Sequence, residues 1–238
     1  MHLILLAAGK GSRLPKKYRN NPKCMVQINH KTILEHNLDF YNNFKFKTIV
    51  GGFKSNKLKS FIKENNFSFI KNEKFNSTNM VYSLFKVRKI KSNKILVCYT
   101  DIIFDPKIYK NIKKIKNSSI VVKRNWLKVW KGRMNFKKIL HDAEDLKTKK
   151  NQVISIGQKL KNKFPKYQYM GIIKLNKIEF LKLKKFFKLL NNKKIDFTTF
   201  LNRAIQEKII KLNFFPTNRY WFEIDNSKDI DYTKKYLW

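Results

Sequence analysis

The stretch LILLAAGKGSR, residues 3–13, decides the fold of this chain. An apolar run from Leu3 to Ala8 is followed by Gly9 to Arg13, a loop that contains two glycines. A short apolar run that stops at a glycine loop is typical of the buried first strand of an α/β sheet. The run lacks the preceding cationic stretch and the length of a secretion signal. We therefore predict a β-strand here.

Residues 32–101 continue with alternating helix and strand patterns. Helical spacing of apolar residues predicts helices over 32–41, 57–65 and 79–90, and apolar or β-branched runs predict strands over 47–51, 67–70 and 95–99. Such alternation favours a parallel sheet with crossover helices. Further along, the patterns predict strands over 120–122, 126–133, 153–156 and 170–175, helices over 177–190 and 198–207, a strand over 221–224 and a helix from Ser227.

Length and composition favour one folded unit. The chain has 238 residues, of which 42% are hydrophobic and 14% aromatic, so a disordered protein is excluded. No run approaches the ~20 apolar residues that cross a bilayer, so we expect no membrane partner. Its two cysteines, Cys24 and Cys98, show no disulfide or zinc spacing, and we expect a cytoplasmic protein. A homodimer is left open.

The net charge of +38 is the feature that points to a different function. Such a charge attracts polyanions, including nucleic acid. However, the lysines are scattered through almost every segment, whereas nucleic-acid sites usually gather them into one patch. We therefore interpret the charge as a compositional bias, and we keep a catalytically inactive, nucleic-acid-binding protein as an alternative.

The loop after the first strand is suited to holding phosphate. Its glycines let the backbone approach an anion, while Arg13 and Lys23 supply cations. The loop lacks the Gly-x-Gly-x-x-Gly of dinucleotide-binding proteins and the Gly-Lys-Ser/Thr of P-loops. The combination of LAAGKGSR with the following Pro22-Lys23 resembles the nucleotidyltransferases that act on sugar phosphates and related alcohol phosphates.

Later blocks extend this resemblance over nearly the whole chain. TNMVYSL (78–84), YTDIIF (99–104), QYMG (168–171) and WFEID (221–225) occur in the order found in proteins similar to phosphocholine and 2-aminoethylphosphonate cytidylyltransferases. The resemblance implies a Rossmann-like, three-layer α/β fold of GT-A type with a mixed, mostly parallel central sheet. It also implies a nucleotide-binding part over about 1–105, a part over about 106–238 that binds the acceptor and closes the site, and a role in making cell-surface polysaccharide or phosphonate.

Two aspartates are candidate magnesium ligands. Asp101 ends one predicted strand and Asp225 ends another, and ligands gather at the carboxyl ends of strands in α/β sheets. Two carboxylates that meet at one point would hold Mg²⁺, which takes few protein ligands. The positions matching these aspartates bind the metal in the family that the chain resembles. Either could instead cap a helix or form a turn.

The resemblance also assigns nucleotide and acceptor residues. Arg13 and Lys23 are expected to act in catalysis by holding the triphosphate, and Asn79 and Ser83, one helical turn apart, could bind a pyrimidine edge. Asn79 could also merely cap its helix. The expected nucleotide-binding residues are Leu6, Ala7, Ala8, Gly9, Lys10, Gly11, Ser12, Arg13, Lys23, Asn79, Ser83 and Thr100.

The acceptor site is expected to carry aromatic and acidic side chains. Trp126, Trp130, Arg133 and Trp221 follow the metal strand and supply aromatic and cationic surface. The aromatic faces could hold an ammonium group, although tryptophans usually pack in cores. Asp196 could bind an amine or cap the next helix. The expected acceptor residues are Trp130, Tyr169, Gly171, Asp196 and Trp221.

The resemblance implies a Mg²⁺-dependent cytidylyltransferase that transfers CMP from CTP to a small phosphate or phosphonate and releases pyrophosphate. Phosphocholine, 2-aminoethylphosphonate, an amino-acid amide phosphate and a sugar 1-phosphate remain open as acceptors. A sugar-1-phosphate uridylyl- or thymidylyltransferase is the alternative enzyme.

Overall fold

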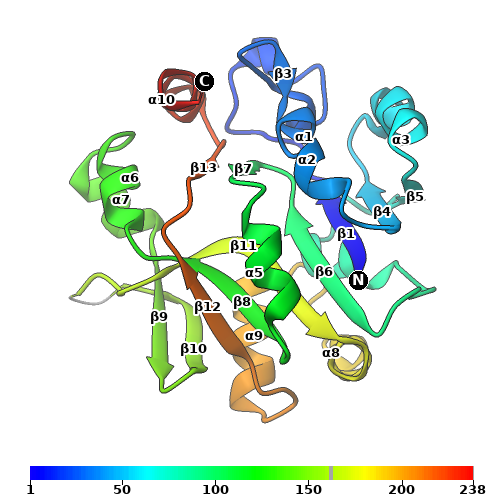
Figure 1. The fold of residues 1–238 in the computed structure, drawn as a ribbon, viewed down its shortest axis with the longest axis vertical. Helices are drawn as coiled ribbons and strands as arrows, with labels where there is room; N and C mark the ends of the chain where they lie inside the picture. The colour runs from blue at the N-terminus through cyan, green and yellow to red at the C-terminus, as the bar shows by residue number, and fades with distance from the viewer. Residues whose placement is uncertain (161–162, 238) are drawn as a thin grey trace.

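The computed structural model describes residues 1–160 and 163–237, and a nine-stranded mixed sheet forms its centre (Figure 1). The half that contains β1 is parallel, and antiparallel pairings begin where β11 joins β6. In spatial order the strands are β5 (Ser68–Lys71), β4 (Phe46–Gly51), β1 (His2–Ala7), β6 (Lys94–Tyr99), β11 (Gln168–Asn176), β8 (Ser119–Lys123), β12 (Asn213–Thr217), β10 (Gln152–Lys159) and β9 (Glu144–Lys149).

Helices cover both faces of the sheet, which gives three layers. Alternate side chains of β1 belong to opposite cores: Ile4 and Leu6 pack on one face, and Leu3 and Leu5 on the other. The first face carries α4 (Met80–Phe85), α8 (Lys177–Leu189) and α9 (Phe197–Gln206). The second carries α1 (Ile33–His36), α2 (Leu38–Tyr41), α3 (Lys59–Glu64), α5 (Ile108–Lys114), α6 (Trp126–Lys131) and α7 (Phe136–Asp142).

A third, smaller core joins the two ends of the chain. Leu14, Ile103 and Ile224 are among its buried members. Asn29 donates from its side-chain amide to the carbonyl of Lys234, so the segment after the glycine loop lies against the C-terminal helix (Figure 1). The elements involved are β2 (Gln27–Ile28), β3 (Lys31–Thr32), β7 (Ile102–Phe104), β13 (Trp221–Glu223) and α10 (Ser227–Tyr236).

The predicted alternation is confirmed, with corrections in some elements. The strand predicted over 126–133 is wrong, because Trp126 and Trp130 lie one turn apart on the buried side of a helix, with ring centroids 5.2 Å apart. The helix predicted over 32–41 is interrupted at Asn37, whose backbone leaves the helical region. The patterns did not predict β7, β9, β12, α5 or α7.

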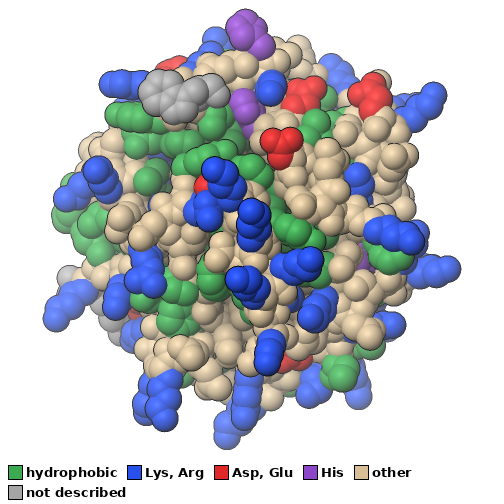
Figure 2. Space-filling view, viewed as in Figure 1, with side chains coloured by type: hydrophobic (Ala, Val, Ile, Leu, Met, Phe, Trp, Pro, Cys, Tyr) green, Lys and Arg blue, Asp and Glu red, His purple; other side chains and the backbone are tan. Residues whose placement is uncertain are grey.

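Basic side chains are spread over the visible surface and do not form one patch (Figure 2). Seven of the 16 acidic residues, in contrast, line one cavity described below. No helix in residues 1–160 and 163–237 has the length and apolar character needed to span a bilayer.

Candidate active site

The pairing of β13 with β7 brings Asp225 to Asp101. Ile224 donates its backbone N–H to the carbonyl oxygen of Asp101 at 2.8 Å, and Glu223 lies opposite Ile102 in the antiparallel register. Asp101 follows β6, which runs parallel to β1. The glycine loop and the first aspartate therefore leave the same edge of the sheet, where α/β proteins gather their ligands.

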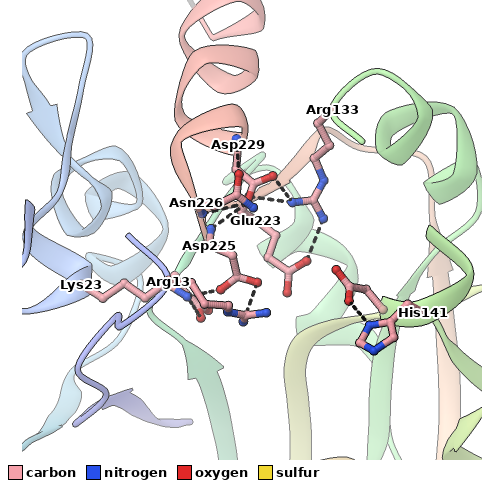
Figure 3. A network of polar contacts seen from close by, with 10 residues as sticks. Arg13, Lys23, Arg133, His141, Glu223, Asp225, Asn226 and Asp229 are labelled. Carbon is pink, nitrogen blue, oxygen red and sulfur yellow. Dashed lines mark hydrogen bonds and ion pairs between the residues drawn. The ribbon is translucent and has the colours of Figure 1, made fainter. Parts of the chain in front are cut away.

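Lys23 binds both carboxylates (Figure 3). Its Nζ donates to Asp101 Oδ2 at 2.7 Å and to Asp225 Oδ1, while Arg13 Nη2 lies 2.9 Å from Asp225 Oδ2. Burial alone would lower the pKa of Lys23, but the two carboxylates outweigh burial and raise it. The amine is therefore a fixed positive charge that contacts both acidic side chains, and Arg13 supplies a second positive charge at Asp225.

The two carboxylates also fit a hard divalent cation. Asp101 Oδ1 is buried and has no hydrogen-bond partner among the described residues, so one oxygen is available as a ligand. Within residues 1–160 and 163–237, no three His, Cys, Asp or Glu side chains lie close enough to hold a metal ion together. A site on this pair would therefore rely on water and substrate oxygens for its remaining ligands, as Mg²⁺ sites commonly do.

Arg133 fixes the turn that carries Asp225. Its guanidinium donates from Nη1 to Asp229 Oδ1 at 2.7 Å and from Nη2 to Glu223 Oε2 at 2.9 Å (Figure 3). The other oxygen of Asp229 accepts the backbone N–H of Asp225 at 2.9 Å and that of Asn226 at 3.0 Å. Arg133 is only 7% exposed and also lines the larger of the two cavities described below. It is a buried cation that joins the side chains of Glu223 and Asp229 to the backbone of Asp225 in one network.

A cavity of about 370 Å³ lies beside the glycine loop. Gly11 has a φ of +63°, and a Cβ there would lie 2.8 Å from Leu14 Cδ1, so the loop requires glycine at this position. Thr100 donates its hydroxyl to the carbonyl of Leu6 at 2.8 Å and ties the loop strand to β6. The lining residues are Leu6, Ala7, Gly9, Gly11, Ser12, Arg13, Lys23, Cys24, Asn79, Met80, Tyr99, Thr100, Asp101 and Asp225.

A second cavity of about 430 Å³ adjoins the first, and Asp101 and Asp225 line both. All five expected acceptor residues line this second cavity: Trp130, Tyr169, Gly171, Asp196 and Trp221. Buried polar atoms without a hydrogen-bond partner within the described part of the chain gather there. They are Asp101 Oδ1, Trp130 Nε1, Arg133 Nε, Gln168 Oε1, Tyr169 Oη and Trp221 Nε1. Such atoms are rare in folded proteins, and a polar ligand in the cavity could supply their missing hydrogen-bond partners.

Three expected nucleotide-binding residues lie outside the lining of both cavities: Ala8, Lys10 and Ser83. Ser83 is buried and its hydroxyl accepts from Asn72 Nδ2 at 2.9 Å, which corrects the expectation that it faces a base. Ser83 does follow Asn79 by one turn of helix α4, as the sequence predicted. However, the side of α4 that carries Ser83 packs against the interior of the protein. Lys10 lies over the ring of Phe75 instead.

Two residues combine a capping role with a place in a cavity. Asn79 caps α4 through the N–H of Met80 at 2.8 Å and lines the loop-side cavity. Asp196 caps α9 through the N–H of Thr199 at 2.8 Å and lines the second cavity. Asp225 does not cap α10, because Asn226 does so. The carboxylate of Asp225 is therefore left for the site.

The sequence analysis missed Glu144, Glu223 and Asp229. The nearness of Glu223 and Asp229 to Asp225 in the sequence could have indicated these two, since Glu223 belongs to the same WFEID block and Asp229 is the third residue of the helix expected from Ser227. No comparable signal in the sequence around Glu144 could have indicated its place in the site. Burial and then the charge of Asp225 raise the pKa of Glu223, which reflects the crowding of acids around this site.

Comparison with known proteins agrees with this geometry. Over 252 aligned residues the chain is 29% identical to a CTP:phosphoglutamine cytidylyltransferase from Campylobacter jejuni, covering 97% of this chain and 98% of that one. A solved CTP:phosphocholine cytidylyltransferase from Streptococcus pneumoniae has a TM-score of 0.78 at 19% identity, covering 100% and 99% of the two chains. An inositol-1-phosphate CTP transferase from T. maritima also has a TM-score of 0.78, at 17% identity and with coverage of 98% and 95%. These likenesses confirm the expected fold.

A comparison with models of protein families identifies the family of this chain. The model of the MobA-like NTP transferase domain matches residues 3–128, more than half of the chain. The matched region includes the glycine loop, Lys23 and the strand that leads to Asp101. The chain therefore belongs to the MobA-like NTP transferase family and is a nucleotidyltransferase.

Proposed function

We propose that this protein transfers CMP from CTP to a small phosphorylated or phosphonylated acceptor and releases pyrophosphate. The observation that carries the proposal is the meeting of two cavities at Asp101 and Asp225. One cavity is bordered by a glycine loop suited to a triphosphate, and the other is rich in polar groups suited to an acceptor. The full-length similarity to a CTP-dependent enzyme supports CTP as the nucleotide.

In this proposal the acceptor's own oxyanion is the nucleophile. It forms a new P–O bond to the α-phosphorus of CTP, the bond between the α-phosphorus and the bridging oxygen breaks, and pyrophosphate leaves with the electron pair. No protein nucleophile and no proton transfer are required. The backbone of Gly9 to Ser12 would hold the phosphates, and Arg13 and Lys23 would balance their charge.

Asp101 and Asp225 would hold Mg²⁺ between the two cavities. When bound, the cation would neutralise charge on the phosphate oxygens of both substrates. Lys23 would then share its hydrogen bonds between the carboxylates and the phosphate oxygens, because its Nζ already lies where the two aspartates meet. Arg133 would keep the Asp225 turn in place through Asp229.

We further propose that residues 1–238 act as one unit, with about 1–105 binding the nucleotide and about 106–238 binding the acceptor. The continuous nine-stranded sheet supports a single unit, since strands from both parts hydrogen-bond to each other at β6 and β11.

Pyrophosphate release tests the proposal. Purified protein is supplied with CTP, UTP, dTTP or ATP, each with a panel of phosphocholine, 2-aminoethylphosphonate, 2-aminoethyl phosphate, an amino-acid amide phosphate and glucose 1-phosphate. We expect release with CTP and at least one of the first four acceptors, and dependence on Mg²⁺. Release confined to UTP or dTTP with glucose 1-phosphate would overturn the choice of CTP.

A further inference from the structure

Two acidic side chains in the second cavity share one hydroxyl group. The Oγ1 of Thr198 lies 2.9 Å from Glu144 Oε1 and 3.0 Å from Asp196 Oδ1. A hydroxyl has one hydrogen, so it can donate to only one of these carboxylates at a time. Glu144 is the first residue of β9 and Asp196 directly precedes α9, so two distant parts of the chain bring these acids together.

This acidic pair has no cationic partner among the residues that the structure describes. The ion pairs within 4.0 Å include neither Glu144 nor Asp196, although the chain contains 54 Lys and Arg residues. Of the other acids that line this cavity, Asp142 contacts His141, and the rest contact Lys23 or Arg133: Asp101, Glu223, Asp225 and Asp229. Burial and the charge of Asp196 raise the pKa of Glu144. A positive charge supplied from outside the chain would stabilise the pair.

Two further hydrogen-bond acceptors line the same cavity without partners in the described structure. These acceptors are Gln168 Oε1 and Tyr169 Oη. Both atoms are buried, and the two residues are only 6% and 8% exposed. Burial and nearby groups, including the charge of Glu144, raise the pKa of Tyr169, so its hydroxyl stays neutral. An unmatched carboxylate, an amide oxygen and a hydroxyl all suit a ligand that donates several hydrogen bonds.

We propose that Glu144, Asp196, Gln168 and Tyr169 form an ammonium subsite that selects acceptors with a protonated primary amine. A primary ammonium group offers three N–H donors, which match these oxygens. A trimethylammonium group offers none, and would leave the amide and hydroxyl oxygens desolvated and unpaired. A neutral acceptor would leave both carboxylates without a counter-charge. Glu144 and Asp196 are thus specificity-determining residues for the acceptor, and this inference rests on the proposed transfer reaction.

The test compares three acceptors that differ only at the amine end: 2-aminoethyl phosphate, phosphocholine and ethyl phosphate, each with CTP. We expect kcat/KM for 2-aminoethyl phosphate to exceed that for ethyl phosphate roughly 100-fold and that for phosphocholine roughly 10-fold. Glu144→Gln is expected to raise KM for 2-aminoethyl phosphate roughly 10-fold and so to reduce the preference for this acceptor over ethyl phosphate by a similar factor. The control Asp145→Asn alters the next residue of β9, which lines neither cavity, and is expected to leave all three rates unchanged.

The outcomes separate the subsite from the reaction. Turnover of phosphocholine or ethyl phosphate at a rate equal to that of 2-aminoethyl phosphate would overturn the ammonium subsite and leave the transfer reaction intact. Equal loss with all three acceptors in Glu144→Gln would do the same, because it would mean a structural role. If CTP supports no turnover, the proposed function fails, and calorimetric binding of the three compounds decides the subsite. Tighter binding of 2-aminoethyl phosphate that Glu144→Gln abolishes supports it, and equal binding of the three overturns it.

Discussion

Ile224 donates its backbone N–H to the carbonyl oxygen of Asp101 at 2.8 Å, and this bond holds two acidic residues from distant parts of the sequence together. Asp101 and Asp225 then receive hydrogen bonds from the same amine of Lys23. Strand pairing therefore sets the separation of the two carboxylates, and Lys23 and Arg133 set their electrostatic surroundings.

Neutralising either aspartate should abolish most of the activity. Asp101→Asn and Asp225→Asn keep the size of the side chain but remove a charge at the junction of the two cavities. We expect kcat for pyrophosphate release to fall by about 100-fold or more in each variant. Asp231→Asn, at an exposed position of α10, is the matched control and should keep full activity. Retention of wild-type kcat in Asp101→Asn and Asp225→Asn would remove both residues from the proposed site.

Replacement of Lys23 should reveal the cation site by a measurement that needs no turnover. Lys23→Met leaves two adjacent carboxylates without their shared amine, and loss of one partner from a buried pair costs about 3–5 kcal/mol. We expect a lower Tm without divalent cation. MgCl2 should raise Tm more in Lys23→Met than in the wild type, since it would relieve the repulsion between the carboxylates. The comparison is made at matched ionic strength, and an equal or smaller Mg²⁺ effect in the variant would argue against the site.

Loss of Arg133 should affect activity through the turn at Asp225. Arg133→Met leaves Asp229 and Glu223 without their buried partner, so we expect destabilisation by about 3–5 kcal/mol. At temperatures where the variant stays folded, kcat should still fall, because Asp229 no longer orders the backbone of Asp225. Arg203→Met, which removes only an exposed pair with Glu207, is the control and should change neither quantity measurably. A folded Arg133→Met with wild-type kcat would contradict the positioning role.

The structure and the sequence lead to different expectations for the variant Ser83→Ala. If its hydroxyl bound the nucleotide base, Ser83→Ala would raise KM for CTP. The structure instead predicts an unchanged KM, together with a loss of stability of about 1 kcal/mol, because Asn72 loses a buried hydrogen-bond acceptor. Urea unfolding and CTP saturation curves on the same preparation decide between the two. Asn79→Ala serves as the comparison, since Asn79 does line the loop-side cavity.

His2 should make the stability of the protein depend on pH. Its ring is buried, with Nε2 2.9 Å from Thr48 Oγ1 and Nδ1 accepting the N–H of Lys91 at 3.2 Å. Burial, followed by the charge of Lys91, lowers the pKa of His2 from 6.5 to about 4. The unfolded chain therefore binds a proton between pH 6.5 and 4 that the folded chain does not bind.

It follows that the free energy of unfolding should decline as pH falls from 6.5 to 4, by up to about 3 kcal/mol from this residue. His2→Gln should lack this part of the decline while keeping the contributions of the other groups. The measurement is urea unfolding at several pH values for both proteins. Parallel curves for the wild type and His2→Gln would contradict the prediction.

Local patterns were sufficient for much of the architecture. The apolar run that became β1, the buried β6 and the helices α8 and α9 were predicted because each buries a periodic set of side chains. The Trp126–Lys131 segment was misassigned, since its tryptophans fit a strand edge as well as a helical face. The short strands β7 and β13 form their hydrogen bonds with each other, and no local pattern indicates such a pairing between distant segments, so β7 was not predicted.

The family, the glycine loop and the two candidate aspartates could be recognised from the sequence, because these features lie in contiguous blocks whose chemistry is local. Only the tertiary structure decided that Ser83 faces inward, that Arg133 is a buried clamp and that Glu144 joins Asp196 without a cation. The physical reason is that orientation and pairing depend on which helical face is buried and on which distant strands meet, and neither is encoded within a short segment.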